Sequence, residues 1–83
     1  MKILYFAWLR ERLNRSDEEV SPPANVLTVS DLIDWLAGRE EDGDLAFGKK
    51  SLIKAAIDAR VADHSAPIAG AKVIALFPPM TGG

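Results

Sequence analysis

The last residues of the sequence have types and spacing suited to chemistry at a carboxylate. Gly82 and Gly83 follow Thr81 and the run FPPM at residues 77–80. Glycine has no Cβ, so these two residues fit a narrow channel and let an attacking group approach the final carbonyl. A free carboxylate is a poor electrophile and needs activation, most simply as an acyl-adenylate made from ATP. We therefore expect Gly83 to react and Gly82 to supply the narrow passage. Thr81 is either a passive spacer or a hydrogen-bonding contact to a partner.

The residues before the glycines are suited to delivering them. Pro78 and Pro79 fix φ and favour extended geometry, so part of the ordering entropy is lost before docking. The segment after Phe77 reaches about 20 Å when extended, at roughly 3.3 Å per residue, which is enough to enter a partner's active site. Burial of Phe77 on that partner, worth roughly 1.5–3 kcal/mol, would offset the ordering of one or two residues at about 1–2 kcal/mol each. A chain end without function is the alternative.

The remaining residue types offer little other chemistry. The chain has no cysteine, which excludes disulfides, thiolate nucleophiles and sulfur ligands for a metal. Its one histidine, His64, lies between Asp63 and Ser65, but sequence neighbours rarely converge as a triad, so a polar turn is the simpler interpretation. We expect no metal site and no catalytic side chain. Sulfur could then be held covalently only as a thiocarboxylate at Gly83.

Length and charge limit the classes of partner. With 83 residues and a formal charge of −2, the chain fits one small domain and has no basic surface for nucleic acid or anionic lipid. No apolar run is long enough to span a bilayer, and residues 3–9 lack the basic start and small-residue cleavage site of a signal peptide. These features indicate a cytoplasmic protein without a nucleic-acid or membrane partner.

Strand patterns occur near both ends of the sequence. Residues 2–9, KILYFAWL, are aromatic and β-branched, and predict a strand that forms a hairpin with a short one in EEVSPP at residues 18–23. Residues 52–62 predict a half-buried strand with a turn near residues 58–60. The last strand, KVIALF at residues 72–77, is apolar on both faces. One of these faces would be left exposed if a helix covered only the other.

A single main helix is expected in the middle of the chain. Val29, Leu32, Ile33 and Leu36 recur at helical spacing after two possible N-caps, and Gly38 would end the helix. The possible N-caps are Thr28 and Ser30. The polar residues 38–51 predict a loop with one helical turn around residues 45–48.

This order of elements indicates an α+β fold of the β-grasp type, a mixed sheet packed on one main helix. The domain would span residues 1–77, and residues 78–83 would form a flexible, extended tail.

Four segments resemble the small subunit of molybdopterin synthase, the MoaD family of ubiquitin-like sulfur carriers. They are KILYFAWLRE, TVSDL, AAID and FPPMTGG. The resemblance implies that a MoeB-like activating enzyme uses ATP to adenylate Gly83, which then becomes a thiocarboxylate. A MoaE-like large subunit would take the tail and pass sulfur to a pyranopterin precursor, and two transfers would build the dithiolene of molybdopterin. The small subunit is noncatalytic, binds no permanent cofactor, and would assemble as two small plus two large subunits.

The resemblance also implies a partner-binding surface. Its residues would be the tail base, one face of the last strand and Val61 from residues 52–62. They are Val61, Val73, Ala75, Phe77, Pro78, Pro79 and Met80. The protein's own loops are the alternative cover for this face. Two departures from the family pattern, at Ile57-Asp58 and at residues 70–72, leave the turn geometry open. A carrier for thiamine or tRNA thiolation, a protein modifier, and an interaction domain with an inert tail remain alternatives.

Overall fold

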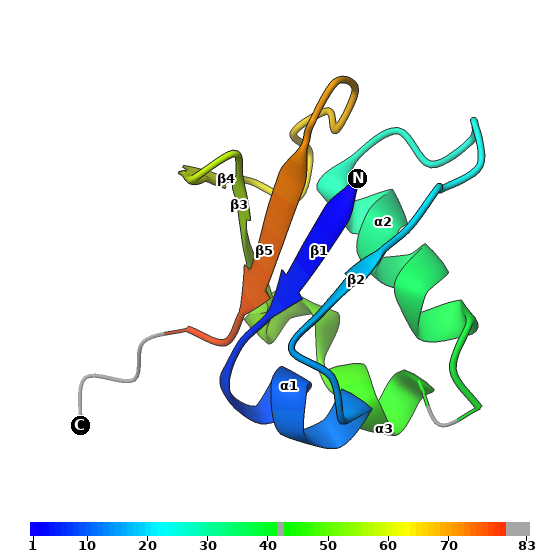
Figure 1. The fold of residues 1–83 in the computed structure, drawn as a ribbon, viewed down its shortest axis with the longest axis vertical. Coiled ribbons are helices and arrows are strands. Elements are labelled where there is room, and N and C mark those ends of the chain that lie inside the picture. The colour runs from blue at the N-terminus through cyan, green and yellow to red at the C-terminus, as the bar shows by residue number, and fades with distance from the viewer. Residues whose placement is uncertain (42, 80–83) are drawn as a thin grey trace.

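A mixed β-sheet forms the framework of the computed structural model, which describes residues 1–41 and 43–79 (Figure 1). Over these residues the five strands run in the order β2-β1-β5-β3-β4. β1 and β5 pair in parallel at the centre, and every other neighbouring pair is antiparallel. The strand bounds are β1 Lys2–Tyr5, β2 Asp17–Glu19, β3 Lys54–Ile57, β4 Arg60–Ala62 and β5 Val73–Phe77.

Helices cover one face of this sheet and leave the other open. Figure 1 shows α2 lying behind β1 and β2, with α1 and α3 at the lower end of the strands. The helix bounds are α1 Ala7–Leu13, α2 Val29–Gly38 and α3 Gly43–Phe47, followed by the 3-10 helix η1 Lys50–Leu52. The core forms between α2 and the inner face of the sheet, where these side chains are at most 2% exposed: Ile3, Tyr5, Val29, Leu32, Ile33, Leu36, Ala55, Ile74 and Leu76.

The start of α2 follows from a capping box. The Thr28 hydroxyl accepts a hydrogen bond from the Asp31 backbone N–H at 3.2 Å, and the Asp31 carboxylate accepts one from the Thr28 N–H at 3.2 Å. These bonds satisfy backbone donors that the first helical turn leaves unpaired. Thr28, one of the two expected caps, is therefore the N-cap, and the predicted end is confirmed because Gly38 is the last helical residue.

The prediction of one strand over residues 2–9 is wrong in its second half. β1 ends at Tyr5, and α1 begins at Ala7. Leu9 and Leu13 are buried and lie one helical turn apart, so both fall on the face of α1 that packs on the core. The predicted pairing of the first two strands is confirmed, although α1 rather than a tight turn connects β1 to β2. β2 ends at Glu19, before Pro22 and Pro23.

The middle of the chain holds more regular structure than the sequence indicated. The expected loop at residues 38–51 contains α3 and most of η1. Phe47 of α3 is buried, and its ring meets Tyr5 edge-on with ring centroids 6.4 Å apart. Gly43 is required at the start of α3, because a Cβ there would lie 1.8 Å from the Ala37 carbonyl oxygen. The expected turn near residues 58–60 is confirmed, since it separates β3 from β4.

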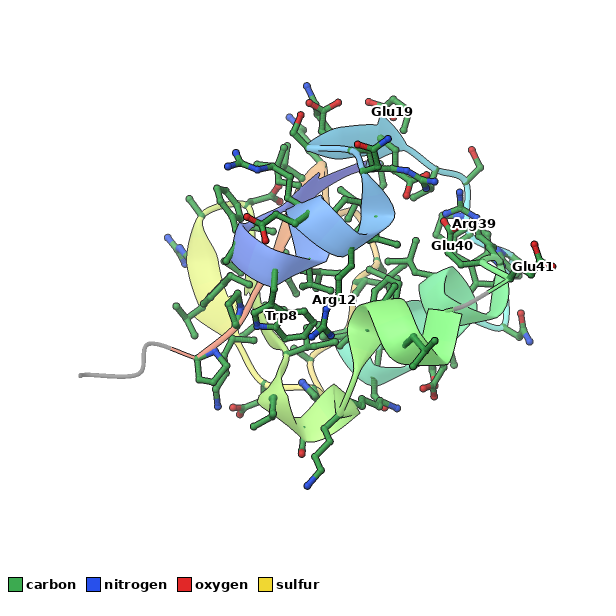
Figure 2. All side chains as sticks on the ribbon, turned by 90° about the horizontal axis from the view of Figure 1, so that it is seen from below. Trp8, Arg12, Glu19, Arg39, Glu40 and Glu41 are labelled. Atoms are coloured by element: carbon green, nitrogen blue, oxygen red, sulfur yellow. The ribbon has the colours of Figure 1, made fainter. Side chains whose placement is uncertain are left out.

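A network of partly buried ion pairs connects β2 to the end of α2. The Glu18 carboxylate accepts hydrogen bonds from the Tyr5 hydroxyl at 2.6 Å, from Arg39 at 2.7 Å and from Arg15 at 3.1 Å. Arg15 also donates to Glu40 at 2.8 Å; Figure 2 shows Arg39 and Glu40 close together at this end of the molecule. Burial alone would raise the pKa of Glu18, but its bonds to Arg39, Tyr5 and Arg15 outweigh burial and hold the pKa below its ordinary value.

Candidate functional site

The outer face of the sheet carries an apolar row that crosses four strands. Leu4 of β1 is the register partner of Ala75 in β5. Ala75 is also the partner of Ala56 in β3, and Ala56 is the partner of Val61 in β4. Because register partners in adjacent strands point to the same face, these four side chains line up on the side opposite α2. We call the full set the open-face patch: Leu4, Ala56, Val61, Val73, Ala75 and Phe77.

Alternation along β5 explains why the patch exists. Ile74 and Leu76 are fully buried, whereas Val73, Ala75 and Phe77 are half-buried on the outer face. The prediction that one apolar set of the last strand would lie away from the helix is therefore confirmed. Val61 is 80% exposed, so the protein's own loops do not cover it. Partly exposed apolar surface on one face of a sheet is a candidate for contact with another protein, so the partner-binding role of these residues stays a prediction.

The centre of the patch is hollowed. A depression of about 320 Å³ is lined by Leu4, Ala56, Asp58, Ala59, Val73 and Ala75. Three of its six lining residues are alanines, whose small side chains leave room for a side chain from another protein. Leu4, Ala56 and Ala59 had not been assigned to this surface from the sequence. Alternation along a strand places Leu4 on the face opposite Ile3, but only the strand register shows that Leu4 lies beside Ala75.

Asp58 fixes the start of β5 beside this depression. Its carboxylate accepts hydrogen bonds from the backbone N–H groups of Lys72 at 3.1 Å and Val73 at 2.9 Å, and its own N–H donates to the Val73 carbonyl at 2.9 Å. Gly70 has a φ of 77°, which glycine adopts without strain. The two departures from the family pattern, at Asp58 and at residues 70–72, thus form one connected turn structure.

The tail base lies next to the patch. Phe77 is the last residue of β5 and the register partner of Lys54. Pro78 and Pro79 follow it and are half-buried. The backbone N–H of Phe6 donates to the Leu76 carbonyl at 3.2 Å. Phe6 therefore lies beside the end of β5, and its side chain is 44% exposed. The other predicted tail residues, Met80, Thr81, Gly82 and Gly83, lie outside the described residues.

His64 has structural partners in the described part of the chain. His64 Nε2 lies 2.6 Å from the Ile53 carbonyl oxygen, and the His64 carbonyl accepts from the Ser30 N–H at 2.9 Å. These contacts tie a turn to the residue before β3 and to the start of α2, as expected for a turn histidine. Over residues 1–41 and 43–79 no group of three or more His, Asp or Glu side chains is arranged to hold a metal ion. No helix in the same residues has the length and apolar character needed to cross a membrane.

Comparison with known proteins places this geometry in context. The model of the ThiS family matches residues 3–83. Two crystal structures of small archaeal modifier protein 1 (SAMP1) from Haloferax volcanii share 24% identity with the chain. One covers 99% of this chain and 97% of its own, with a TM-score of 0.72, and the other 95% of each, with a TM-score of 0.71. No curated protein matches significantly.

A third structure carries a different functional name. It is a putative molybdopterin converting factor, subunit 1, from Pyrococcus furiosus, with 24% identity, a TM-score of 0.73 and 95% coverage of both chains. At this level of identity the three structures establish the fold, which is the ubiquitin-like β-grasp expected from the sequence.

Proposed function

The chain belongs to the ThiS family of ubiquitin-like sulfur carriers, and from this we propose that it is the sulfur carrier subunit of molybdopterin synthase. One observation carries the proposal: the segment FPPMTGG continues directly from β5, a central strand whose outer face is part of an exposed apolar patch. A reactive end and a docking surface are thereby joined in one element. The similar P. furiosus structure, named as a molybdopterin converting factor subunit, supports the same assignment.

The proposed chemistry takes place at the carboxylate of Gly83. An oxygen of this carboxylate attacks the α-phosphorus of ATP on a separate activating enzyme, and pyrophosphate leaves. A sulfide equivalent then attacks the carbonyl carbon and displaces AMP, which gives a thiocarboxylate. In the synthase this sulfur attacks a carbon of the pyranopterin precursor and replaces an oxygen substituent, so a C–S bond forms as a C–O bond breaks. Water then cleaves the acyl–sulfur bond and regenerates the carboxylate. Two such cycles supply the two sulfurs of the dithiolene.

In the proposed cycle this chain's residues bind the partner proteins and position the tail, and the large subunit supplies the catalytic side chains. The open-face patch would dock on the large subunit and, at a different time, on the activating enzyme. Phe77, Pro78 and Pro79 would hold the tail base, so that Gly82 and Gly83 enter the partner's active site. The assembly would contain two small and two large subunits.

A protein modifier is the second candidate function, because two of the similar structures are of a small archaeal modifier protein. In that case a lysine amine, rather than sulfide, would attack the activated Gly83 and form an isopeptide bond. Carriers for thiamine or tRNA thiolation would share the thiocarboxylate but deliver it to another enzyme. The fold is common to these functions, so the acceptor of the acyl group must be measured.

Complementation distinguishes the candidates. The chain is expressed in cells that lack their own molybdopterin synthase small subunit, and molybdoenzyme activity is measured. We expect the intact chain to restore activity and a variant lacking Gly83 to fold normally but restore none. A conjugate of the chain with other proteins, in the absence of restored activity, would support the modifier function instead. Restoration by the shortened chain would refute the assignment of Gly83.

A further inference from the structure

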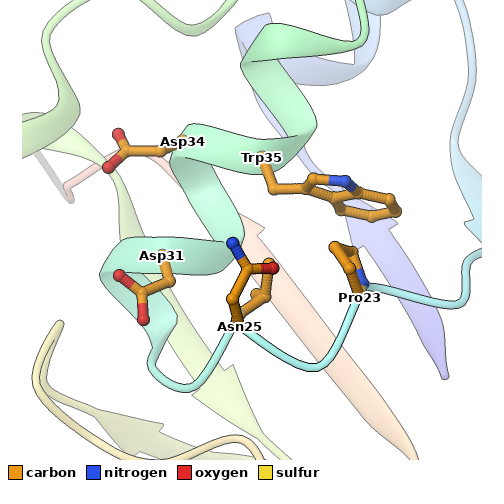
Figure 3. Close-up of a pocket in the computed structure, with 6 residues that line it drawn as sticks. Pro23, Asn25, Asp31, Asp34 and Trp35 are labelled. Atoms are coloured by element: carbon orange, nitrogen blue, oxygen red, sulfur yellow. The ribbon is translucent and has the colours of Figure 1, made fainter.

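A second concave surface lies on the helical side of the molecule. It is a groove of about 310 Å³ between the connection that precedes α2 and the first turns of α2 itself (Figure 3). Since α2 packs on the inner face of the sheet, the groove and the open-face patch are on opposite sides of the domain. A ligand in the groove would therefore leave the patch free. The lining residues are Pro23, Asn25, Val26, Asp31, Asp34 and Trp35.

The groove has one apolar end and one acidic end. In Figure 3 the Trp35 indole and the Pro23 ring point toward each other at the apolar end. Asp31 and Asp34 project from the helix at the other end, and the Asn25 amide lies between the two ends. This arrangement matches a side chain with an apolar stem and a cationic head, which is the chemistry of arginine and lysine.

The charges around the acidic end favour a cation. No lysine or arginine lines the groove. Oxygen Oδ2 of Asp31 accepts hydrogen bonds from the Leu27 N–H at 3.1 Å and the Thr28 N–H at 3.2 Å. Its second oxygen has no hydrogen-bond partner among the described residues, so it can accept one from a ligand. Asp34 is 65% exposed, and its Oδ2 lies 2.8 Å from the Lys50 ammonium. The other carboxylate oxygen of Asp34 can therefore also accept a hydrogen bond from a ligand.

The protein's own cations show how both walls of the groove bind positive charge. Lys50 binds Asp34, and the Arg39 guanidinium lies 5.0 Å from the centre of the Trp35 ring. Arg39 is one turn C-terminal to Trp35, whereas Asp31, which lines the groove, is one turn N-terminal to it. Neither cation is among the lining residues, but Lys50 is close enough to Asp31 for its charge to act on that carboxylate too. A ligand cation would therefore compete with Lys50 at the acidic end.

We propose that this groove binds an arginine side chain presented by an extended segment of a partner protein. The arginine stem would lie along Trp35 and Pro23, and its guanidinium would reach Asp31 and Asp34. Arginine fits better than lysine because its planar fork can donate to two carboxylates at once. The site does not depend on the sulfur carrier function, and its position allows such a partner to bind while the open-face patch is occupied.

NMR titration tests the site with a defined probe. The ¹⁵N-labelled full chain is titrated with the peptide acetyl-Gly-Arg-Gly-amide, and with the matched peptide in which neutral citrulline replaces arginine. We expect a saturable shift of the Trp35 indole N–H with the arginine peptide and little change at Trp8, the only other tryptophan of the sequence. The citrulline peptide should give no saturable shift.

Charge variants locate the binding. Asp34→Asn should weaken the arginine peptide by about threefold to tenfold, since one charge-assisted contact is lost. Asp63→Asn, an exposed carboxylate outside the groove, is the matched control and should change nothing. Lys50→Gln removes the internal competitor for Asp34 and should tighten binding. The proposal would be overturned by equal responses of both tryptophans or by the absence of a saturable shift. Equal affinity for the citrulline peptide, or an Asp34→Asn variant that binds as tightly as the unmodified chain, would also overturn it.

Discussion

Val61 provides a sharp test of the open-face patch, because it can be changed with little effect on the folded monomer. Its side chain is 80% exposed and it lies on β4, at the edge of the sheet. Replacing Val61 by aspartate should therefore lower the free energy of unfolding by less than about 1 kcal/mol, the span of strand propensity. Burial of valine on a partner is worth about 1.5 kcal/mol. Placing an unpaired carboxylate under the partner adds at least about 1 kcal/mol more.

The expected loss of binding energy is thus about 2.5 kcal/mol or more, which corresponds to a dissociation constant raised roughly 50-fold or more. Titration calorimetry with the large synthase subunit measures it, and thermal unfolding checks the fold. Leu27→Asp is the matched control, because Leu27 is 63% exposed but lies in the connection before α2, away from the patch. If Val61→Asp binds as tightly as the unmodified chain, or if both variants lose affinity equally, the patch is not the docking surface.

Three further predictions concern the framework that positions the patch. Asp58 and Ala59 form the β3–β4 turn with φ of 47° and 73°. Because glycine adopts positive φ without strain, Ala59→Gly should stabilise the domain by about 1 kcal/mol in urea unfolding. An unchanged or lower stability would show that the Ala59 backbone is not strained. Asp58→Ala leaves the exposed Lys72 and Val73 N–H groups without their carboxylate partner and should cost about 0.5–1.5 kcal/mol, while Asp58→Asn keeps an acceptor and should cost less; equal losses would show that these bonds do not matter. The folded pKa of Glu18 is lowered from 4.5, so its contribution to stability is present above that pH and disappears as pH falls through the folded value. The stability difference between the unmodified chain and Glu18→Gln should shrink over that acidic range, and a constant difference would refute the role of the ion network.

The core of the fold could be predicted from sequence because local patterns agreed with tertiary packing. Alternation put Ile74 and Leu76 on one face of the last strand, and both are fully buried. The helical spacing from Val29 to Leu36 and the cap at Thr28 likewise matched α2. In each case one buried face, repeated over several residues, determined the element.

Residues 6–13 could not be assigned in the same way. Phe6, Ala7 and Trp8 continue the aromatic and apolar run of β1, so strand propensity and helix spacing competed over a short segment. The helix is favoured by long-range contacts: Leu9 and Leu13 enter a core whose other walls come from distant parts of the chain. The missed members of the patch depend on strand register in the same way, since no local signal places Ala56 beside Ala75.

The groove beside α2 was also outside the reach of sequence patterns. Pro23 lies in the connection before α2 and Trp35 lies within α2, so no local pattern pairs them. The capping role of Asp31 gives no indication that this residue also lines a groove. Only the packed conformation brings an apolar end and an acidic end together.

The central claim is that the carboxylate of Gly83 is the atom group on which the protein's function depends. The full chain should be incubated with its activating enzyme, ATP and a sulfide source, and its C-terminal peptide analysed by mass spectrometry. We expect the mass change of one oxygen replaced by sulfur on the peptide ending in Gly83, and none when ATP is omitted. A C-terminal peptide that keeps its original mass with every component present would contradict the claim.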